Sequence, residues 1–133
     1  MVTGSCLCGA VSFTLRGPLR DVLGCHCGQC RKQTGHFWAA TSVPDEALEM
    51  THQDGLAWYR ASDTVQRGFC RECGATLFWK PDNAPRIAVG VGGLEQPTGL
   101  KMTSHVFVAD KGDYYEIADG LPQHERFSGG EDA

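Results

Sequence analysis

Cysteine spacing limits the folds that this chain of 133 residues can adopt. The seven cysteines fall into three groups: Cys6-Leu7-Cys8, Cys25-His26-Cys27-Gly28-Gln29-Cys30 and Cys70-Arg71-Glu72-Cys73. An odd number of thiols cannot all form disulfides, and cytosolic thiols are kept reduced. We therefore interpret the cysteines as ligands of metal ions that hold a small fold together.

Two of the groups are pairs, and each pair needs another pair to complete a metal site. Structural zinc is bound tetrahedrally by four protein ligands, whereas catalytic zinc has three and leaves one position for water or substrate. Joining the first pair to the last satisfies both and leaves the middle group intact. The sequence thus predicts a closed structural zinc site with the ligands Cys6, Cys8, Cys70 and Cys73.

The middle group, Cys25, Cys27 and Cys30, is predicted to bind a second zinc ion and to form the catalytic site. Three thiolates make the metal a weak Lewis acid, so binding an incoming soft thiolate suits it better than forming hydroxide. Two alternatives stay open: the thiols are reactive redox cysteines, or they bind iron and sulfide. The fourth position can also be vacant or filled by a nearby side chain, and the site is then not catalytic.

Glycines and arginines accompany the closed site. Gly9 follows Cys8 and Gly74 follows Cys73, so the backbone can turn tightly there and point amide groups at the sulfurs. Arg67 and Arg71 are expected to offset the thiolate charge of the closed site.

Short segments that alternate apolar and polar residues predict an all-β fold with minimal helix. Strands are expected at 11–16, 19–24, 37–43, 48–52, 56–59, 65–69, 76–80, 87–91 and 105–108. The one helix of a turn or two is expected over 28–34, with Gly35 as a left-handed C-cap. Residues 1–127 should form a single domain, and the small and acidic residues 128–133 a disordered tail.

Charge and hydropathy restrict the location and the partners. No signal peptide is recognisable before Cys6, and no apolar run approaches the ~20 residues that span a bilayer. We therefore expect a cytoplasmic protein without membrane contacts. The formal charge is −4, and seven thiolates with two zinc ions would bring it to about −7. This charge repels phosphate backbones and argues against nucleic acid as a partner.

Motifs along most of the chain add to the cysteine pattern. They are Cys6-Leu7-Cys8-Gly9, Cys25-His26-Cys27-Gly28-Gln29-Cys30-Arg31-Lys32-Gln33-Thr34-Gly35, Phe69-Cys70-Arg71-Glu72-Cys73-Gly74, Ser104-His105-Val106-Phe107-Val108 and Tyr115-Glu116-Ile117-Ala118-Asp119-Gly120-Leu121-Pro122. Together, from Cys6 to about Phe127, they resemble the glutathione-dependent formaldehyde-activating enzyme family, also called the centromere protein V/GFA domain.

This resemblance implies a fold and an activity. The fold would be an Mss4-like β-tent of short antiparallel sheets stapled by two zinc ions. The activity would be that of a carbon–sulfur lyase that forms S-(hydroxymethyl)glutathione, with glutathione as co-substrate and formaldehyde as the aldehyde.

Basic residues follow the open site closely. Arg31 and His36 are candidates for binding the carboxylates of glutathione through charge-assisted hydrogen bonds. Lys32 is better explained as part of a solvated basic turn.

Rings near the open site have structural and functional interpretations. Phe37 and Trp38 can wall a pocket, but aromatic residues at the start of a strand are more often core residues. His26 is expected to point away from the metal. His105, on an apolar strand, is expected to be a hydrogen-bonded core residue rather than a fourth ligand or a base.

Two hypotheses for function follow. The leading one is an enzyme that binds a small thiol at the open zinc and joins it to an aldehyde. The alternative is a non-enzymatic zinc-stabilised binding or adaptor domain that contacts a protein through its sheet. The group of three thiolates favours the enzyme, because a purely structural module does not need it. The sequence gives no indication of the oligomeric state.

Overall fold

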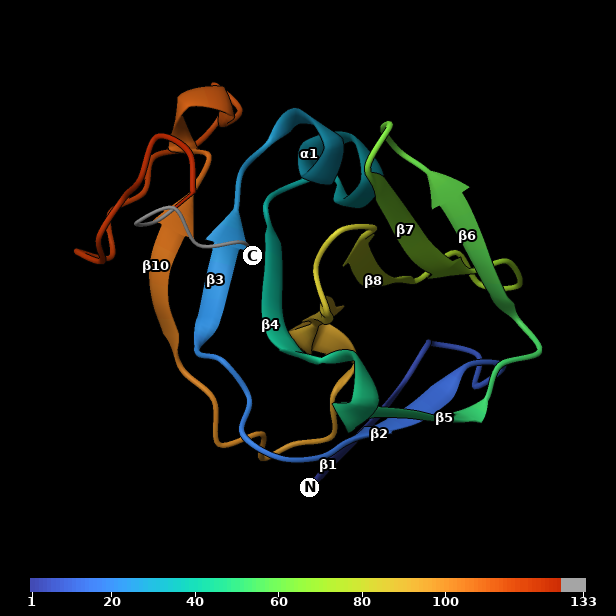
Figure 1. The fold of residues 1–133 in the computed structure, drawn as a ribbon. Coiled ribbons are helices and arrows are strands. Elements are labelled where there is room, and N and C mark those ends of the chain that lie inside the picture. Colours follow the sequence, from blue (N-terminus) through green and yellow to red (C-terminus); the bar gives the residue numbers. More distant parts are fainter. Residues whose placement is uncertain (128–133) are drawn as a thin grey trace.

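The computed structural model describes residues 1–127, where ten strands form two sheets (Figure 1). The predicted all-β fold with minimal helix is confirmed. The predicted tail, 128–133, lies outside the described residues. The smaller sheet has the order β1-β2-β5 and is antiparallel; its strands are β1 (Val2–Ser5), β2 (Ser12–Leu15) and β5 (Leu48–His52).

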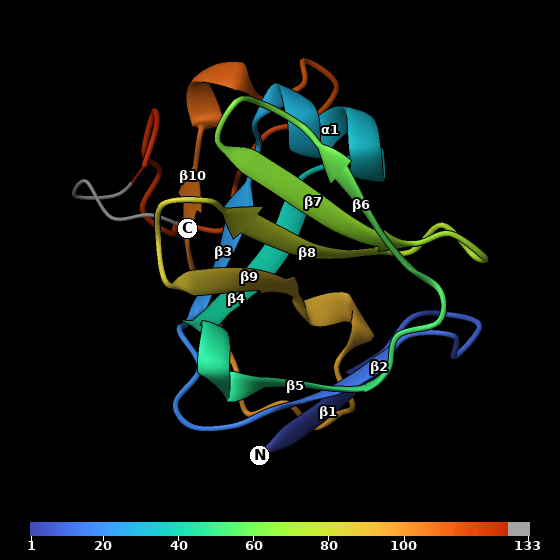
Figure 2. The same ribbon diagram turned by 45° about the vertical axis from the view of Figure 1, so that its right-hand side comes forward.

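The larger sheet has seven strands in the order β10-β3-β4-β9-β8-β7-β6. Its strands are β3 (Val22–Cys25), β4 (Trp38–Pro44), β6 (Leu56–Arg60), β7 (Val65–Cys70), β8 (Thr76–Pro81), β9 (Arg86–Gly90) and β10 (Met102–Val106). Figure 2 shows β7, β8 and β9 side by side above the strands of the smaller sheet. Three 3-10 turns, η1 (Asp45–Ala47), η2 (Val91–Gly93) and η3 (Val108–Asp110), link the strands.

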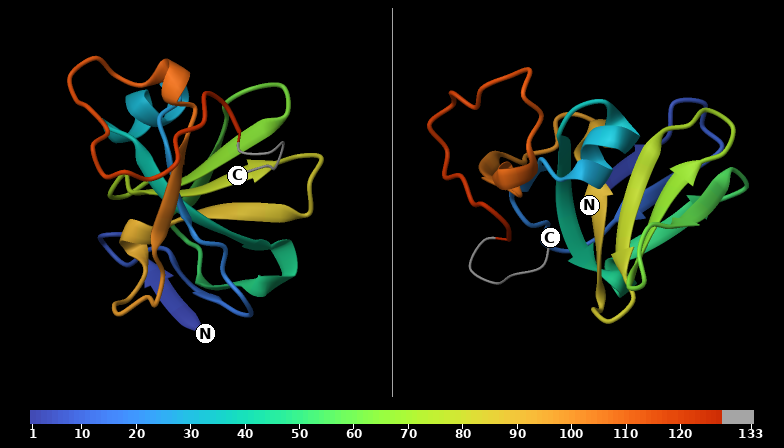
Figure 3. Two further views of the ribbon diagram at one scale, coloured as in Figure 1. Left: turned by 90° about the vertical axis from the view of Figure 1, so that its left-hand side faces the viewer. Right: turned by 90° about the horizontal axis from the view of Figure 1, so that it is seen from above.

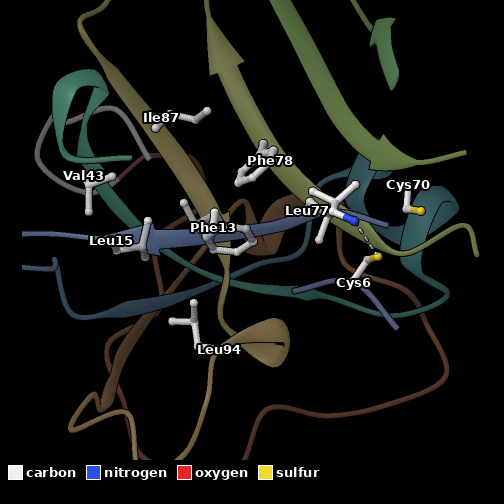
Figure 4. Packing of buried hydrophobic residues seen from close by; sticks show 11 residues of the cluster. Cys6, Phe13, Leu15, Val43, Cys70, Leu77, Phe78, Ile87 and Leu94 are labelled. Atoms are coloured by element: carbon white, nitrogen blue, oxygen red, sulfur yellow. Dashed lines mark hydrogen bonds between the residues drawn. The ribbon is translucent and has the colours of Figure 1, made fainter. Parts of the chain in front are cut away.

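The two faces of the larger sheet have different roles, because successive side chains of a strand point to opposite sides. One face packs against the smaller sheet and forms the main hydrophobic core (Figure 4), which includes Phe13, Leu15, Val43, Phe78, Ile87 and Val89. Phe13 meets Phe78 edge to face, with ring centres 5.2 Å apart. On the other face Trp38, Ala40 and Ala88 pack around Cys30. The second face therefore carries one of the cysteine groups.

Helix α1 (Gly28–Thr34) connects β3 to β4 and has the predicted bounds. The Sγ atom of Cys27 caps its first turn by accepting a hydrogen bond from the Cys30 amide. At the other end Gly35 has φ 86°, and its N–H donates to the Arg31 carbonyl. The predicted left-handed C-cap is thus confirmed. No helix in residues 1–127 has the length and apolar character needed to cross a membrane.

Strand pairing departs from the expectation at one edge of the larger sheet. β10 runs parallel to β3, whereas the other strand pairs are antiparallel. The segment after β10 folds back along it, with the amide of His105 donating to the Pro122 carbonyl and the amide of His124 donating to the His105 carbonyl. Figure 3 shows this C-terminal segment, in red, beside β10.

Candidate metal centres and an adjoining cavity

The first cysteine cluster consists of Cys6, Cys8, Cys70 and Cys73, whose sulfurs all lie within 4.8 Å of one another. The Cys6–Cys8 and Cys8–Cys70 sulfur separations are 3.8 Å and 3.7 Å. Tetrahedral zinc with Zn–S bonds of 2.3 Å requires sulfurs about 3.8 Å apart. The cluster therefore has the donor type, number and spacing that fit such an ion.

Two tight turns shape this cluster. Gly9 has φ 87° and Gly74 has φ 79°, a backbone conformation that side chains with a Cβ rarely adopt. After the first turn, the amide of Val11 donates to the Cys6 sulfur at 3.3 Å. The predicted role of the glycines is confirmed. Figure 4 shows the Cys6 and Cys70 sulfurs at one end of the main core.

The second cluster consists of Cys25, Cys27 and Cys30, again with sulfurs within 4.8 Å of one another. Cys25 ends β3, Cys27 caps α1, and Cys30 lies in the first turn of the helix. The partition of the cysteines into four and three is thus reproduced by the geometry. Hydrogen bonds from Cys25 and Cys30 lower the pKa of the Cys27 thiol, and the Cys30 amide and the Arg67 charge act in the same direction.

Arg67 lies at the second cluster, so its predicted place beside the closed site is wrong. The guanidinium donates to the sulfurs of Cys30 at 3.5 Å and Cys27 at 3.9 Å. It also donates to the side-chain oxygens of Gln29 and Gln33 on α1, and it is almost completely buried. Alternation along β7 places Arg67 on the cavity side of the sheet, away from the first cluster. Arg71, by contrast, follows Cys70 directly and donates to the Leu56 carbonyl.

A cavity of about 430 Å³ opens beside the second cluster. Cys25, Cys27 and Cys30 line it, together with Arg20 and Arg67. Much of the remaining wall is apolar and includes Leu23, Trp38, Val65, Trp79, Val106 and Phe127. Trp38 is therefore both a buried residue of the sheet and a wall of the cavity. The arrangement is typical of a small-molecule site, with apolar walls around a few polar groups.

His26 points away from the second cluster, as predicted, and belongs to a buried polar array. Its Nε2 lies 2.9 Å from Nδ1 of His105, and Nε2 of His105 lies 2.8 Å from the Asp119 carboxylate. Nδ1 of His26 is hydrogen-bonded to the Tyr115 hydroxyl. Burial lowers the pKa of His26 to about 4, so its ring is neutral near pH 7. His105 is accordingly a hydrogen-bonded core residue, and the array ties the segment after β10 to the cysteine loop.

The other predicted site residues lie outside the cavity. Arg31 and His36 do not line it; His36 packs against Phe37 and contacts the Tyr114 hydroxyl. Arg31 reaches back to Gly28, its Nη2 lying 3.7 Å from where a Cβ on Gly28 would stand. Lys32 is exposed, in agreement with a solvated basic turn. Contacts of Arg31 and His36 with glutathione stay a prediction.

Arg20 and the histidine–aspartate array were missed by the sequence analysis. Arg20 precedes β3 in a segment predicted to be strand, and its local pattern carries no sign that it lines a cavity. The motif Tyr115 to Pro122 contained the partners of the array, but nothing in their spacing indicated that they contact His26.

Two cysteine clusters that could hold metal ions, one closed and one beside a cavity, define a small metal-binding β-domain. Residues 1–110 match the glutathione-dependent formaldehyde-activating enzyme (GFA) family, and the chain belongs to that family.

The proteins similar to this chain include a fungal one and a bacterial one. A Schizosaccharomyces pombe protein named as an uncharacterized lyase is 24% identical over 117 residues, which cover 87% of this chain and 85% of that protein. A structural-genomics crystal structure of a Rhodobacter sphaeroides protein matches with a TM-score of 0.61 and 26% identity, covering 76% of this chain and 99% of the other.

Proposed function

We propose that this protein is a zinc-dependent carbon–sulfur lyase that binds a small thiol at Cys25, Cys27 and Cys30 and adds it to an aldehyde or releases it. The observation that supports this proposal most directly is that these three sulfurs converge at the wall of an apolar cavity. A closed structural site would need a fourth ligand, whereas this cluster faces a space that a small molecule can enter. Membership in the GFA family and the lyase name of the yeast relative support the same class of reaction.

The residues of the cavity supply charge balance and shelter from water. A zinc ion held by Cys25, Cys27 and Cys30 would accept an incoming thiol and keep it ionised near neutral pH. Arg67 offsets part of the thiolate charge, and the indoles of Trp38 and Trp79 exclude water from the space beside the sulfurs.

The reaction itself needs no oxidant or reductant. A bond forms between the thiol sulfur and the aldehyde carbon, and the carbonyl oxygen gains the proton that the thiol gives up, so the product is a hydroxyalkyl thioether. The reverse reaction breaks the same carbon–sulfur bond. Holding both reactants in one cavity lowers the entropic cost of bringing them together.

The test compares the wild type with Cys27→Ser. Free thiols add to formaldehyde spontaneously, so the comparison is made at a pH of about 6.5, where a free thiol is mostly protonated and the background is slow. The wild type should accelerate formation of S-(hydroxymethyl)glutathione, or of the corresponding adduct of a smaller thiol, and Cys27→Ser should not.

A matched control is Lys32→Ala, which changes an exposed residue of the same helix and should keep the wild-type rate. Equal rates for the wild type and Cys27→Ser with every thiol tried would contradict the lyase and favour a zinc-stabilised binding domain.

A further inference from the structure

Arg20 is a cation of the cavity that forms no ion pair with a carboxylate of residues 1–127. Its Nε and Nη2 donate to the carbonyls of Asp21 at 3.2 Å and Ala40 at 3.0 Å. The buried Nη1 has no hydrogen-bond partner in residues 1–127, and Arg20 takes part in no ion pair there. Burial, helped by the charge of Arg86, lowers its pKa to about 10, so the group is still charged near pH 7. A buried charge without an anionic partner is costly.

The second guanidinium of the cavity makes the contrast clear. Arg67 donates hydrogen bonds to two cysteine sulfurs and to two glutamine side chains. Among residues 1–127 the one carboxylate that lines the cavity is Asp110, which is exposed and not paired with Arg20. Arg20 is therefore the lining cation that has a donor to spare for a ligand.

Strand register relates the places where Arg20 and the cysteines meet β4. Arg20 binds the carbonyl of Ala40, while Cys25 pairs with Trp38, two residues along β4. Residues two apart on one strand face the same side and are about 7 Å apart. The places where Arg20 and Cys25 meet β4 are thus one strand repeat apart, which favours a short ligand over a long one. The wall between them is apolar, formed by Leu23, Trp38 and Ala40.

We propose that Arg20 anchors a carboxylate and that the substrate is a short mercapto acid, or its aldehyde adduct, with an apolar chain of two or three carbons. The carboxylate pairs with the Arg20 guanidinium, and the sulfur lies at Cys25, Cys27 and Cys30. Glutathione fits this arrangement less well, because it carries two carboxylates and an ammonium group into a cavity with apolar walls. The inference rests on the proposed function, since it assigns the thiol of that reaction.

The test uses ligands that differ in one group and the zinc-loaded protein under reducing conditions. Binding of 3-mercaptopropionate, its methyl ester, propionate and glutathione is measured by calorimetry. A charge-assisted pair with Arg20 should make the acid bind about ten- to a hundredfold more tightly than the ester. Equal affinity of acid and ester for the wild type would overturn the anchor.

Variants locate the effect. Arg20→Met should abolish the preference for the acid, and Arg20→Lys should restore part of it. Arg16→Met is the matched control, because Arg16 pairs with Glu49 of the smaller sheet and does not line the cavity; it should keep the full preference. If Arg20→Met does not fold, the acid–ester comparison on the wild type and Arg20→Lys still decides.

Remaining outcomes separate this inference from the proposed function. Propionate that binds the wild type but not Arg20→Met supports Arg20 as the anchor of a carboxylate. If no thiol reacts in the same protein, that result counts against the lyase and leaves the anchor in place. Glutathione that binds more tightly than 3-mercaptopropionate, and equally to Arg20→Met, would overturn the short mercapto acid while leaving the lyase intact.

Discussion

Single side chains around the second cluster set how firmly it can hold an ion. Arg67 reaches both Cys27 and Cys30, so Arg67→Met should remove the charge that offsets their thiolates while keeping most of the side-chain volume. We expect affinity for the ion at this cluster to fall about ten- to a hundredfold, as is usual for groups that support metal ligands. Competition with a coloured chelator measures this affinity.

The control for this prediction is Arg71→Met, beside the closed cluster. Arg71 donates to a backbone carbonyl and to none of the cysteine sulfurs. Its replacement should leave both ions bound as in the wild type. Loss of the ion of the closed cluster from Arg67→Met would contradict the place that we assign to this guanidinium.

The polar array offers a second prediction at this scale. His105→Leu leaves the buried Nε2 of His26 without a partner, and an unsatisfied buried polar group costs about 1–3 kcal/mol. Asp119→Asn keeps an acceptor for Nε2 of His105 and should cost less. Melting temperatures at one fixed zinc concentration compare the two variants. If Asp119→Asn lowered the melting temperature more than His105→Leu, the array would not stabilise the fold through the pair of histidines.

At the scale of elements, the sequence predicted correctly the bounds of those strands and helices that depend on neighbouring residues alone. The bounds of β5 and α1 agree with the prediction, since alternation fixes the strand and Gly35 ends the helix. β1 was missed, because four residues that include Gly4 carry little alternation. β10 lies at 102–106 rather than 105–108, because Phe107 adopts φ 55° and ends the strand.

The same division holds for the candidate site: the cysteine clusters were predictable from the sequence, and the residues around them were not. Ligand spacing alone gave both cysteine clusters. The positions of Arg67 and Arg20 depend instead on which face of the larger sheet each side chain joins, and that is fixed by register with strands far away in the sequence. The parallel pairing of β10 with β3, which brings His105 to His26, likewise depends on contacts between segments that are distant in the sequence.

The turn after Cys73 supplies a prediction about an element. Gly74 and Gly99 both have positive φ, and a Cβ added at either meets no atom within 4 Å. Gly74→Ala and Gly99→Ala should therefore cost the same backbone strain, about 1 kcal/mol. Gly74→Ala should in addition weaken metal binding at the closed cluster, and Gly99→Ala should not. Equal chelator sensitivity of the two variants would show that this turn does not shape the metal site.

In the whole molecule, the two clusters occupy different places. Cys6 and Cys8 lie between β1 and β2 of the smaller sheet, while Cys70 ends β7 of the larger sheet and Cys73 lies in the turn before β8. An ion there joins the two sheets at the end of their shared core. The second cluster joins only β3 to α1, which follow each other in the chain. Metal at the first cluster should thus contribute far more to folding, because the unfolded chain does not hold those ligands together.

Cys70→Ser and Cys30→Ser test this difference in a matched way, because both cysteines are completely buried and the substitution is the same. Cys70→Ser should lose the bond between the sheets and unfold or precipitate. Cys30→Ser should keep its circular dichroism spectrum and bind one zinc ion, where the wild type binds two. Metal analysis under anaerobic, reducing conditions gives the counts. A folded Cys70→Ser beside an unfolded Cys30→Ser would reverse the assignment, and one zinc ion, or iron with sulfide, in the wild type would reject the two-zinc protein.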